Sequence, residues 1–465
     1  MIANLQPYPD YKESGLPWLG QMPTHWGLKR GKSVFQSIDQ RSATGQEELL
    51  TVSSARGIVP RRTASVTMFK AESYLGYKLC WPGDLVINSL WAWGGGLGVS
   101  RHHGIISSAY GVYRIRTGAQ LIPDYVHELV RSSAFHWELQ VRSKGVWISR
   151  LQLTDISFLD APIPLPPPEE QAVIVRFLDY ANGRLERAIR SKRKVIALLH
   201  EQKQAIIHCA VTRGLDPTVH LKPSGIPWLG DIPQHWEIVP LKFLCRRIQN
   251  GATPPSSEQH YYENGSVPWF GPSSVGMASE LGAPVRHLNK VAFADGKARL
   301  ISGPAILVIV IGATAGKMGL LVGEGATNQQ ITAFELKENA IVPQFGIQQL
   351  RCSENWLKST ASTATIPILD SGIVNRLPVA FPPCGEQQAI LSAISLQTQP
   401  LTTAIAHLER EIELLREYRT RLVADVVTGK LDVRAAAAKL PDLPAESALE
   451  PAAEDAQEDI EGGEE

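Results

Sequence analysis

The chain has 465 residues, of which 44% are hydrophobic, and its 46 Lys and Arg are balanced by 46 Asp and Glu. This length allows about two to four domains of roughly 100–200 residues each, and the composition is that of a folded protein. The longest apolar run, 305–313, is far shorter than the roughly 18–20 residues that a membrane helix needs. With no secretion signal recognised, we expect a cytoplasmic protein without a membrane segment.

Cysteine spacing and charge distribution restrict the partners. The five cysteines are scattered and none has CxxC spacing, so they suggest neither disulfides nor a zinc site. Residues 27–150 hold 16 Lys and Arg against 8 Asp and Glu, whereas residues 237–376 hold 12 against 10. A basic segment favours a polyanionic partner, and a solvated basic surface without a partner is the alternative.

The chain contains an internal repeat. Residues 12–26 read KESGLPWLGQMPTHW and residues 222–236 read KPSGIPWLGDIPQHW, which share ten of fifteen positions at an offset of 210. Two tryptophans with Gly and Pro at fixed spacing predict docking of the chain onto helices or a partner, rather than contact with bases. A second repeated motif, Pro-Pro-x-x-Glu-Gln, occupies 166–171 and 382–387 at an offset of 216.

An amphipathic stretch follows each Pro-Pro-x-x-Glu-Gln motif. Apolar residues recur about every 3.5 positions, which is typical of a heptad repeat. We assign the two apolar heptad positions to every seventh residue from Leu178 and from Ala181. The second stretch has the same phase 216 residues later. Asn182-Gly183 and Pro400 interrupt the stretches, so we predict a short helix, a break and then long helices over 184–210 and 400–427. Matching length and phase favour antiparallel packing of the two over separate cores. The predicted spacer residues are Leu185, Val195, Leu199, Ile206, Leu401, Leu408, Leu415 and Leu422.

The blocks between the motifs show little resemblance to each other in sequence. Strands expected at 85–87, 112–115, 305–311 and 330–336 indicate mixed α/β content. The predicted fold class is α+β, with two mixed α/β domains separated by two long antiparallel coiled-coil helices and an internal pseudo-twofold repeat. The predicted segments are a first domain over 1–160, a central spacer helix region over 161–216, a second domain over 217–380, a C-terminal spacer helix region over 381–433 and an acidic disordered tail over 434–465.

The sequence offers no catalytic constellation. The segment 312–317 resembles a Walker A loop but has three residues instead of four between its glycines, and Met318 follows its lysine. The glycines of 94–98 do not form a dinucleotide fingerprint, and no Pro-Pro pair has the Asn/Asp-Pro-Pro-aromatic form expected of an adenine methyltransferase. We therefore predict that the chain alone is not an enzyme and binds neither a metal nor a cofactor.

The two repeated motifs together resemble the specificity subunit of a type I restriction–modification system, over roughly residues 11–433. The resemblance implies a non-catalytic subunit of a phage-defence complex that reads a bipartite, asymmetric site on double-stranded DNA and directs adenine methylation or restriction. It further implies that the spacer helices dock two methyltransferase subunits, that ATP-dependent motor-nuclease subunits join, and that S-adenosylmethionine, ATP and Mg²⁺ are bound by those partners.

The alternative is a two-domain protein scaffold on a coiled coil that does not read DNA. A steep fall of duplex affinity with salt would distinguish the two, because only phosphate neutralisation predicts that slope.

Side chains suited to base edges and phosphates gather after the predicted strands, although each could equally be an ordinary core or loop residue. The candidates in the first domain are Arg61, Arg62, Asn88, Ser89, Trp91, Trp93, Arg101 and His102. The candidates in the second domain are Arg246, Arg247, Asn250, Tyr261, Thr314, Lys317, Asn328, Gln329 and Gln330.

Overall fold

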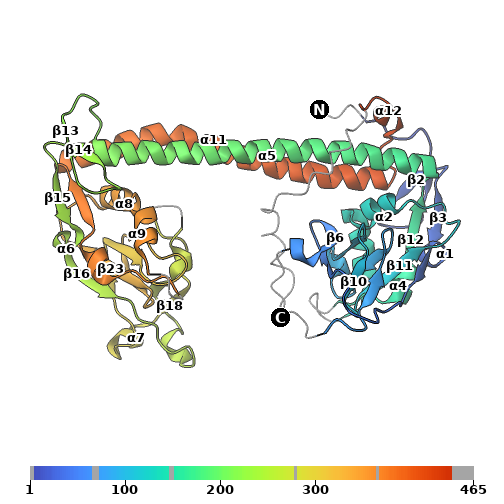
Figure 1. Ribbon diagram of the computed structural model, residues 1–465, viewed down its shortest axis with the longest axis horizontal. Helices are drawn as coiled ribbons and strands as arrows, with labels where there is room; N and C mark the ends of the chain where they lie inside the picture. Colours follow the sequence, from blue (N-terminus) through green and yellow to red (C-terminus); the bar gives the residue numbers. More distant parts are fainter. Residues whose placement is uncertain (1–4, 65–72, 146–150, 277–279, 363–365, 442–465) are drawn as a thin grey trace. The chain divides into compact units, whose positions relative to one another are not determined.

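The computed structural model describes residues 5–64, 73–145, 151–276, 280–362 and 366–441 (Figure 1). The chain divides into two compact units that interleave in sequence. Unit 1 comprises Met1–Arg193 with Glu409–Glu465, and unit 2 comprises Lys194–Leu408. These units cut across the predicted linear segments, because each of the two long helices belongs partly to one unit and partly to the other.

Unit 1 is built around a four-stranded antiparallel sheet with the order β4-β11-β8-β9. Its strands are β1 (Tyr11–Glu13), β2 (Gln21–Pro23), β3 (Gly27–Arg30), β4 (Phe35–Ser37), β5 (Leu50–Ser53), β6 (Gly57–Pro60), β7 (Lys78–Cys80), β8 (Leu85–Ile87), β9 (Leu97–Val99), β10 (Gly104–Ile106), β11 (Gly111–Ile115) and β12 (Pro162–Leu165). Its short helices are α1 (Gly31–Val34), η1 (Arg61–Thr63), η2 (Ala92–Gly94), α2 (Pro123–Val130), α3 (Ser133–Arg142) and α4 (Asp155–Leu159).

Unit 2 has a corresponding antiparallel sheet with the order β16-β23-β20-β21, and a second sheet with the order β18-β17-β22-β19. Its strands are β13 (Leu221–Pro223), β14 (Asp231–Pro233), β15 (Glu237–Pro240), β16 (Cys245–Asn250), β17 (Val267–Phe270), β18 (Arg286–Leu288), β19 (Ile301–Ser302), β20 (Ala305–Ile309), β21 (Met318–Leu321), β22 (Glu324–Thr327), β23 (Ile331–Leu336) and β24 (Pro378–Phe381). Its short helices are α6 (Leu241–Leu244), η4 (Gln259–Tyr261), η5 (Pro272–Ser274), α7 (Lys290–Ala294), α8 (Pro343–Arg351), α9 (Glu354–Thr360) and α10 (Ser371–Asn375).

The central sheets of the two units have the same topology although their sequences differ. In each, one long strand (β11 or β23) pairs on one side with β4 or β16 and on the other with β8 or β20. The outermost strand, β9 or β21, completes the antiparallel order. The four strands expected from the sequence are confirmed, and buried β-branched and aliphatic residues such as Val86, Ile306 and Val308 explain them.

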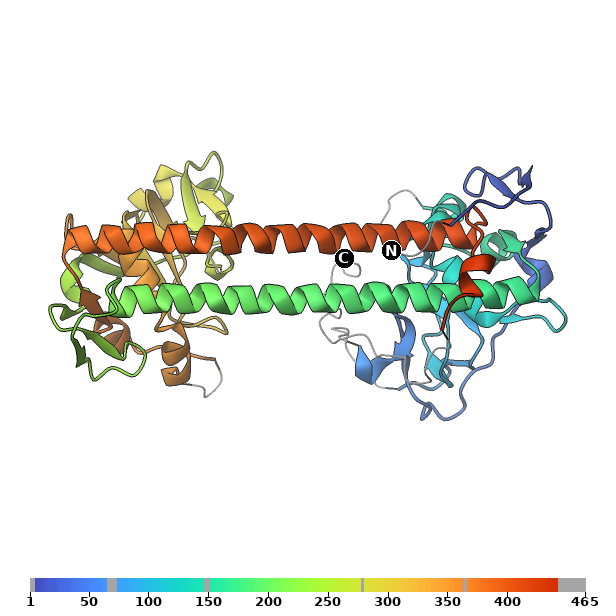
Figure 2. The same cartoon turned by 90° about the horizontal axis from the view of Figure 1, so that it is seen from above.

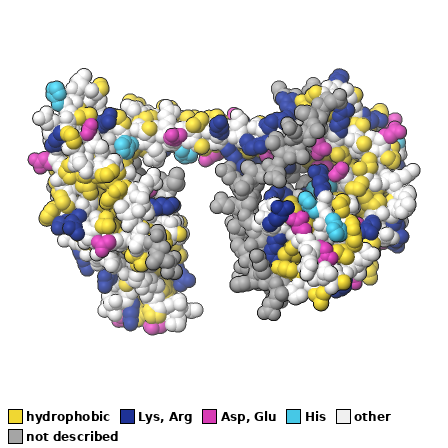
Figure 3. Space-filling view, in the orientation of Figure 1, with side chains coloured by type: hydrophobic (Ala, Val, Ile, Leu, Met, Phe, Trp, Pro, Cys, Tyr) yellow, Lys and Arg dark blue, Asp and Glu magenta, His cyan; other side chains and the backbone are white. Residues whose placement is uncertain are grey.

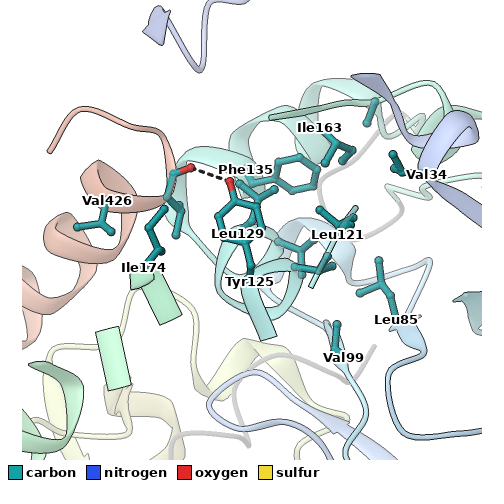
Figure 4. Close-up of a cluster of buried hydrophobic side chains, with 14 of the residues drawn as sticks. Val34, Leu85, Val99, Leu121, Tyr125, Leu129, Phe135, Ile163, Ile174 and Val426 are labelled. Atoms are coloured by element: carbon teal, nitrogen blue, oxygen red, sulfur yellow. Dashed lines mark hydrogen bonds between the residues drawn. The ribbon is translucent and has the colours of Figure 1, made fainter. Parts of the chain in front are cut away.

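The core of unit 1 joins the sheet to the long helices (Figure 4). Tyr125 and Leu129 of α2 are fully buried beside Ile174 and Val426, which come from the two long helices. The buried hydroxyl of Tyr125 donates a hydrogen bond to the carbonyl oxygen of Val427, at 3.3 Å. The start of one long helix and the end of the other are therefore packed into the same hydrophobic core.

The two long helices are unbroken. Helix α5 (Pro168–Arg213) has 46 residues and α11 (Cys384–Val427) has 44, with Pro400 inside it (Figures 1 and 2). The predicted breaks at Asn182-Gly183 and Pro400 are therefore wrong. A glycine costs a helix about 1 kcal/mol and an internal proline about 3 kcal/mol. Apolar residues buried on both sides of each site, such as Leu178 and Leu185 in α5, offset that local cost.

The two long helices contact each other along a seam of inward-facing side chains. Of the two heptad positions predicted to form this seam, the structure confirms one. Side chains at every seventh residue from Leu185 are buried or half-buried, as are those from Leu401 to Leu422. The second heptad position that faces the partner helix lies four residues after each of these, whereas the prediction placed it three residues after. Val195, at the predicted position, is therefore 42% exposed and lies outside the seam. The residues at this second position are Ile189, Ile196, Lys203 and Ala210 in α5, and Thr398, Ile405, Ile412, Arg419 and Val426 in α11.

Polar contacts establish antiparallel pairing of the helices within each unit. In unit 1, Arg419 of α11 is bonded to Glu186 of α5, and Lys192 is bonded to Glu411. In unit 2, the Lys203 ammonium donates to the Thr402 hydroxyl at 2.9 Å. Residue numbers thus rise in α5 as they fall in α11, as antiparallel pairing requires, and the predicted fold class is confirmed.

The first eight residues of the predicted disordered tail are structured. Helix α12 (Arg434–Ala437) follows α11, Ala437 is 2% exposed, and Leu440 packs against the core of unit 1. The Arg434 guanidinium is bonded to Asp432 at 2.7 Å and lies 5.1 Å from the Tyr8 ring centroid. Short apolar side chains within this segment explain the packing, and residues 442–465 lie outside the described part of the chain.

Unit 1 contains a histidine that burial keeps neutral. His127 of α2 lies against Gly57 and Gly98, where an added methyl group would come within 2.8 and 3.4 Å of its ring. The Val99 N–H donates to its Nδ1 at 3.2 Å. Burial, followed by the positive charge of Arg131, lowers the pKa of His127 to about 3.

We expect His127 to make unit 1 less stable as the pH falls. The folded side chain remains neutral while the unfolded one, with its ordinary pKa near 6.5, takes up a proton. Between pH 7.5 and 5.5 this uptake costs about 1.4 kcal/mol of unfolding free energy. Replacing His127 by Asn, whose side-chain oxygen can accept the same backbone hydrogen bond, should reduce the measured loss over that interval by about this amount. An unchanged pH dependence in chemical denaturation would contradict the assignment.

Candidate nucleic-acid interface

One edge of the central sheet in unit 1 gathers polar and aromatic loop residues. We call it loop edge 1: residues 88–96 and 107–110, where β8 ends and β9 and β11 begin. The Asn88 amide donates to the Tyr110 hydroxyl at 3.4 Å, and Ser89 donates to the Ala109 carbonyl at 3.2 Å. Burial raises the pKa of Tyr110, and the positive charge of Arg61 acts in the opposite sense.

The two candidate tryptophans shape loop edge 1. The Trp93 indole N–H donates to the Leu90 carbonyl at 3.2 Å, and the Trp91 carbonyl accepts the Gly96 N–H at 3.0 Å. The Trp91 ring packs so closely on Gly94 and Gly96 that neither position has room for a Cβ atom. Both indoles are half-buried, so they hold the loop in shape while part of each ring faces outward.

Three first-domain candidates lie away from this cluster. Arg101 and His102 follow the end of β9, which is the opposite edge of the sheet, and Arg101 lies 3.4 Å from Asp124. The exposed Arg62 forms a 2.8 Å ion pair with Glu48. The sequence grouped residues 88–102 as one surface, but a strand crosses the sheet between them and separates the two ends.

Unit 2 presents the equivalent edge, which we call loop edge 2: residues 250–253, 310–317 and 328–330. Here β16 and β20 end and β21 and β23 begin, so most of the second-domain candidates come together. The candidates that lie on it are Asn250, Thr314, Lys317, Asn328, Gln329 and Gln330.

Hydrogen bonds fix the directions of these side chains. The Thr253 hydroxyl donates to the Gln329 amide oxygen at 2.5 Å, and the Asn328 amide donates to that of Gln330 at 2.8 Å. The Thr332 hydroxyl donates to the amide oxygen of Asn250 at 2.7 Å. Asn and Gln amides offer adjacent donors and acceptors, the pattern that matches an adenine edge, so loop edge 2 is chemically suited to base readout.

Three second-domain candidates lie elsewhere. Arg246 and Arg247 are at the start of β16, at the opposite end of the strand from Asn250, and Arg246 donates to the Ser302 carbonyl at 2.9 Å. Tyr261 is 4% exposed and its hydroxyl donates to Asp295 at 3.2 Å. Its side chain thus belongs to the packing around η4. A buried tyrosine commonly places its ring in a core while its hydroxyl finds a hydrogen-bond partner.

Sequence reasoning missed two loop-edge residues that organise their neighbours, Thr253 and Tyr110. Thr253 lies three residues after β16 and Tyr110 directly precedes β11, but no charge or motif marks either one. Their position next to Pro254 and Gly111 was the available signal, since such residues frequently flank strands. Lys and Arg side chains are scattered among hydrophobic ones on the visible faces of both units (Figure 3), so the side chains at the loop edges are more informative than overall charge.

The repeated motifs form a side-chain arrangement that occurs in both units, which we call the clasp. In unit 1, Glu170 at the start of α5 is 6% exposed and accepts hydrogen bonds from the Tyr8 hydroxyl at 2.5 Å and the Trp26 indole at 3.0 Å. Its other oxygen lies 2.7 Å from His25 Nε2. The Trp26 ring and Pro23 press against Gly429 at the end of α11. The clasp thus joins the start of one long helix to the end of the other, which confirms the predicted structural role of the motif.

The clasp of unit 2 repeats this geometry. Glu386 at the start of α11 accepts from the Trp236 indole at 3.0 Å and lies 2.9 Å from His235. Gly214, which follows α5 with φ +75°, faces Trp236. The glutamine after each glutamate anchors a loop of the same unit: Gln171 accepts from Ile122 N and Gln387 from Val342 N, both at 2.8 Å.

The described residues contain no group of three or more His, Cys, Asp or Glu that could hold a metal ion. Within the same ranges, no helix combines the length and apolar character needed to cross a membrane.

With this geometry established, comparison with known proteins defines the class. Residues 233–414 match the family described as the type I restriction modification DNA specificity domain. This match covers most of the second half of the repeat, including Trp236 and Glu386 of its clasp and the whole of loop edge 2. The resemblance carried by the repeated motifs is thereby confirmed: this part of the chain carries the DNA specificity domain of type I restriction–modification systems.

Particular relatives agree. The chain is 27% identical over 311 residues to the type I restriction enzyme MjaVIII specificity subunit of Methanocaldococcus jannaschii, covering 64% of this chain and 68% of the relative. It is 24% identical over 283 residues to the EcoR124I/EcoR124II specificity subunit of Escherichia coli, covering 58% and 62%. A solved chain from a type I restriction–modification system shares the fold, with a TM-score of 0.59 and 18% identity over 88% of this chain and 99% of that one.

Proposed function

We propose that the chain reads a bipartite, asymmetric site on double-stranded DNA, with loop edge 1 contacting one half and loop edge 2 the other. One observation carries the proposal. The same edge of the same sheet bears Asn88, Ser89 and two indoles in unit 1, but a set of asparagine and glutamine amides in unit 2. Equivalent surfaces with unlike donors and acceptors are suited to unlike base sequences.

We further propose that the long helices dock two methyltransferase subunits. Outward positions of α5 carry Val195 and Leu198, which are 42% and 55% exposed, and α11 carries Leu414 and Tyr418, 48% and 42% exposed. Aliphatic and aromatic side chains three or four residues apart on a helix suit docking of a partner helix. Motor-nuclease subunits complete the complex in this proposal. S-adenosylmethionine, ATP and Mg²⁺ belong to the partners, this chain holds no cofactor, and the complex acts in the cytoplasm.

Gln329→Ala tests the assignment of loop edge 2. Gln329 is exposed and held by Thr253, so its loss should cost about 1–3 kcal/mol of discrimination at one base pair of one half-site. The measurement is the methylated sequence produced by the variant together with its methyltransferase partners.

Val322→Ala is the matched control, since Val322 is 64% exposed just beyond β21 at the opposite edge of the sheet. It should leave the methylated sequence unchanged. Relaxation by the control, or an equal loss of methylation at every site in the Gln329 variant, would count against base readout at this edge.

A further inference from the structure

Unit 1 has a surface groove that the proposed reading of DNA does not use. It has a volume of about 570 Å³ and lies between the end of α3 and α4, beside α1. Its apolar side chains are Val141, Ile156 and Leu159, and its cationic ones are Lys32, Arg142 and Lys144. The groove is thus apolar in part and basic in part.

The apolar part is unusually accessible. Val141 is 62% exposed and Ile156 is 82% exposed, although they lie on neighbouring helices and line one groove. Adjacent exposed aliphatic residues in a concave site favour a ligand that itself carries an aliphatic side chain. A phosphate backbone alone would leave these two side chains without a suitable contact.

The basic part has more positive charge than its acids neutralise. Lys32 Nζ and Arg142 Nη1 lie 3.9 and 3.8 Å from the carboxylate of Asp160, which is also bonded to Arg30. Arg142 is additionally paired with Glu138 at 2.6 Å. Among the residues that the structure describes, no carboxylate forms an ion pair with Lys144. Four cations therefore share two acids, and an added carboxylate would be favourable here.

We infer that this groove binds the chain's own acidic C-terminal segment, residues 442–465. That segment contains ten Asp and Glu and no Lys or Arg, with aliphatic side chains at Leu443, Leu449 and Ile460. Ile460 lies between Asp459 and Glu461, so one short stretch offers an aliphatic side chain flanked by carboxylates. This combination complements both parts of the groove.

The attachment point of the segment lies within reach. Arg176 on the third turn of α5 donates to the carbonyl of Leu440 at 3.2 Å, and Ala437 is buried in the core of unit 1. From there to the groove, the path follows the start of α5, about 12 Å, and the strand pair β3–β12, about 13 Å. A chain of 24 residues can span up to about 80 Å, and tethering of this kind gives effective concentrations in the millimolar range.

Binding of a labelled peptide tests the inference. The chain truncated after Pro441 should bind a fluorescent peptide of residues 442–465 saturably, and more weakly at high salt because part of the attraction is electrostatic. The full-length chain should bind the same peptide at least tenfold more weakly, because its own segment occupies the groove. Absence of peptide binding to the truncated chain, or equal binding to both chains, would overturn the inference.

Groove variants locate the site. In the truncated chain, Ile156→Ser and Lys144→Glu should each weaken peptide binding at least tenfold. The control Arg41→Glu makes the same change of net charge at an exposed residue that pairs with Asp39 outside the groove, and it should change affinity less than threefold. Equal weakening by Lys144→Glu and Arg41→Glu, with none from Ile156→Ser, would assign the peptide to general basic charge, such as a DNA-facing surface, and overturn the inference.

Discussion

Replacing Glu170 by Ala is expected to reduce the local free energy of unfolding of unit 1 by about 3–5 kcal/mol. Glu170 is 6% exposed and is the shared acceptor for Tyr8, His25 and Trp26. Removing it leaves three donors without their charged partner, and hydrogen bonds to charged groups are worth about 1.5–3 kcal/mol each, although not additively. Hydrogen exchange of the strand pair β3–β12, which leads directly into α5, measures this loss.

Glu386→Ala is the matched control in unit 2. Among the described residues, its carboxylate accepts from Trp236 and His235 only. Its side chain is 28% exposed, because the position equivalent to Tyr8 is Thr218. The expected loss at β15–β24 is about 1–3 kcal/mol, smaller than in unit 1. Equal losses at the two clasps would show that the hydrogen bond from buried Tyr8 does not make the clasp of unit 1 more stable than that of unit 2.

Lengthening both long helices by four residues is expected to lengthen the unread spacer between the half-sites. Four residues add about 6 Å to a helix, which corresponds to between one and two base pairs of duplex at about 3.4 Å each. Because the helices are antiparallel, the insertions are placed opposite each other, after Leu199 in α5 and after Ala404 in α11. Both helices are then lengthened at the same point along the pair. Mapping the methylated sequence should show both half-sites unchanged.

An insertion in α5 alone is the control for this prediction. It shifts one side of the seam relative to the other, so Lys203 and Thr402 lose their register, and methylation should fall without a clean change of spacer. Unchanged spacing in the doubly lengthened chain would mean that the helices do not set the gap.

Much of the fold could be predicted from the sequence because the repeat is explicit. The Pro-Pro-x-x-Glu-Gln motifs marked both helix starts, and the motif around Trp26 predicted docking onto helices. The shared sheet order of the two units could not be predicted in this way. It depends on buried strands whose only common requirement is apolar character, and that requirement leaves their sequences free to diverge.

The helix interior shows why local signals failed. Asn182, Gly183 and Pro400 are poor helix residues, yet tertiary packing on both sides outweighs their cost. The second contact position was misassigned by one residue. A heptad alternates spacings of three and four, and in α5 both choices place mostly apolar or small residues there. In α11 the correct choice places Ile405 and Ile412 inward, where the other had placed Ala404 and Glu411.

The candidate site was predicted in parts. Proximity along the chain grouped Asn88 with Arg101, but strands β8 and β9 carry the chain across the sheet and back, so the two lie at opposite edges. In unit 2, strand β16 likewise places Arg246 and Asn250 at opposite ends, although they are close in sequence. Residues on both sides of a turn, such as Gln329 and Gln330, stay together because no strand intervenes.

The most direct test of the account is the methylated sequence written by a chain in which residues 237–376 are replaced by the corresponding block of a specificity subunit with a different target. The exchange retains both clasps and both long helices, and it carries the whole of loop edge 2. The account predicts that one half of the recognised sequence changes completely while the other half and the spacer between them remain the same. A change in both halves, or methylation that keeps its original sequence, would contradict the claim that the two units read DNA independently.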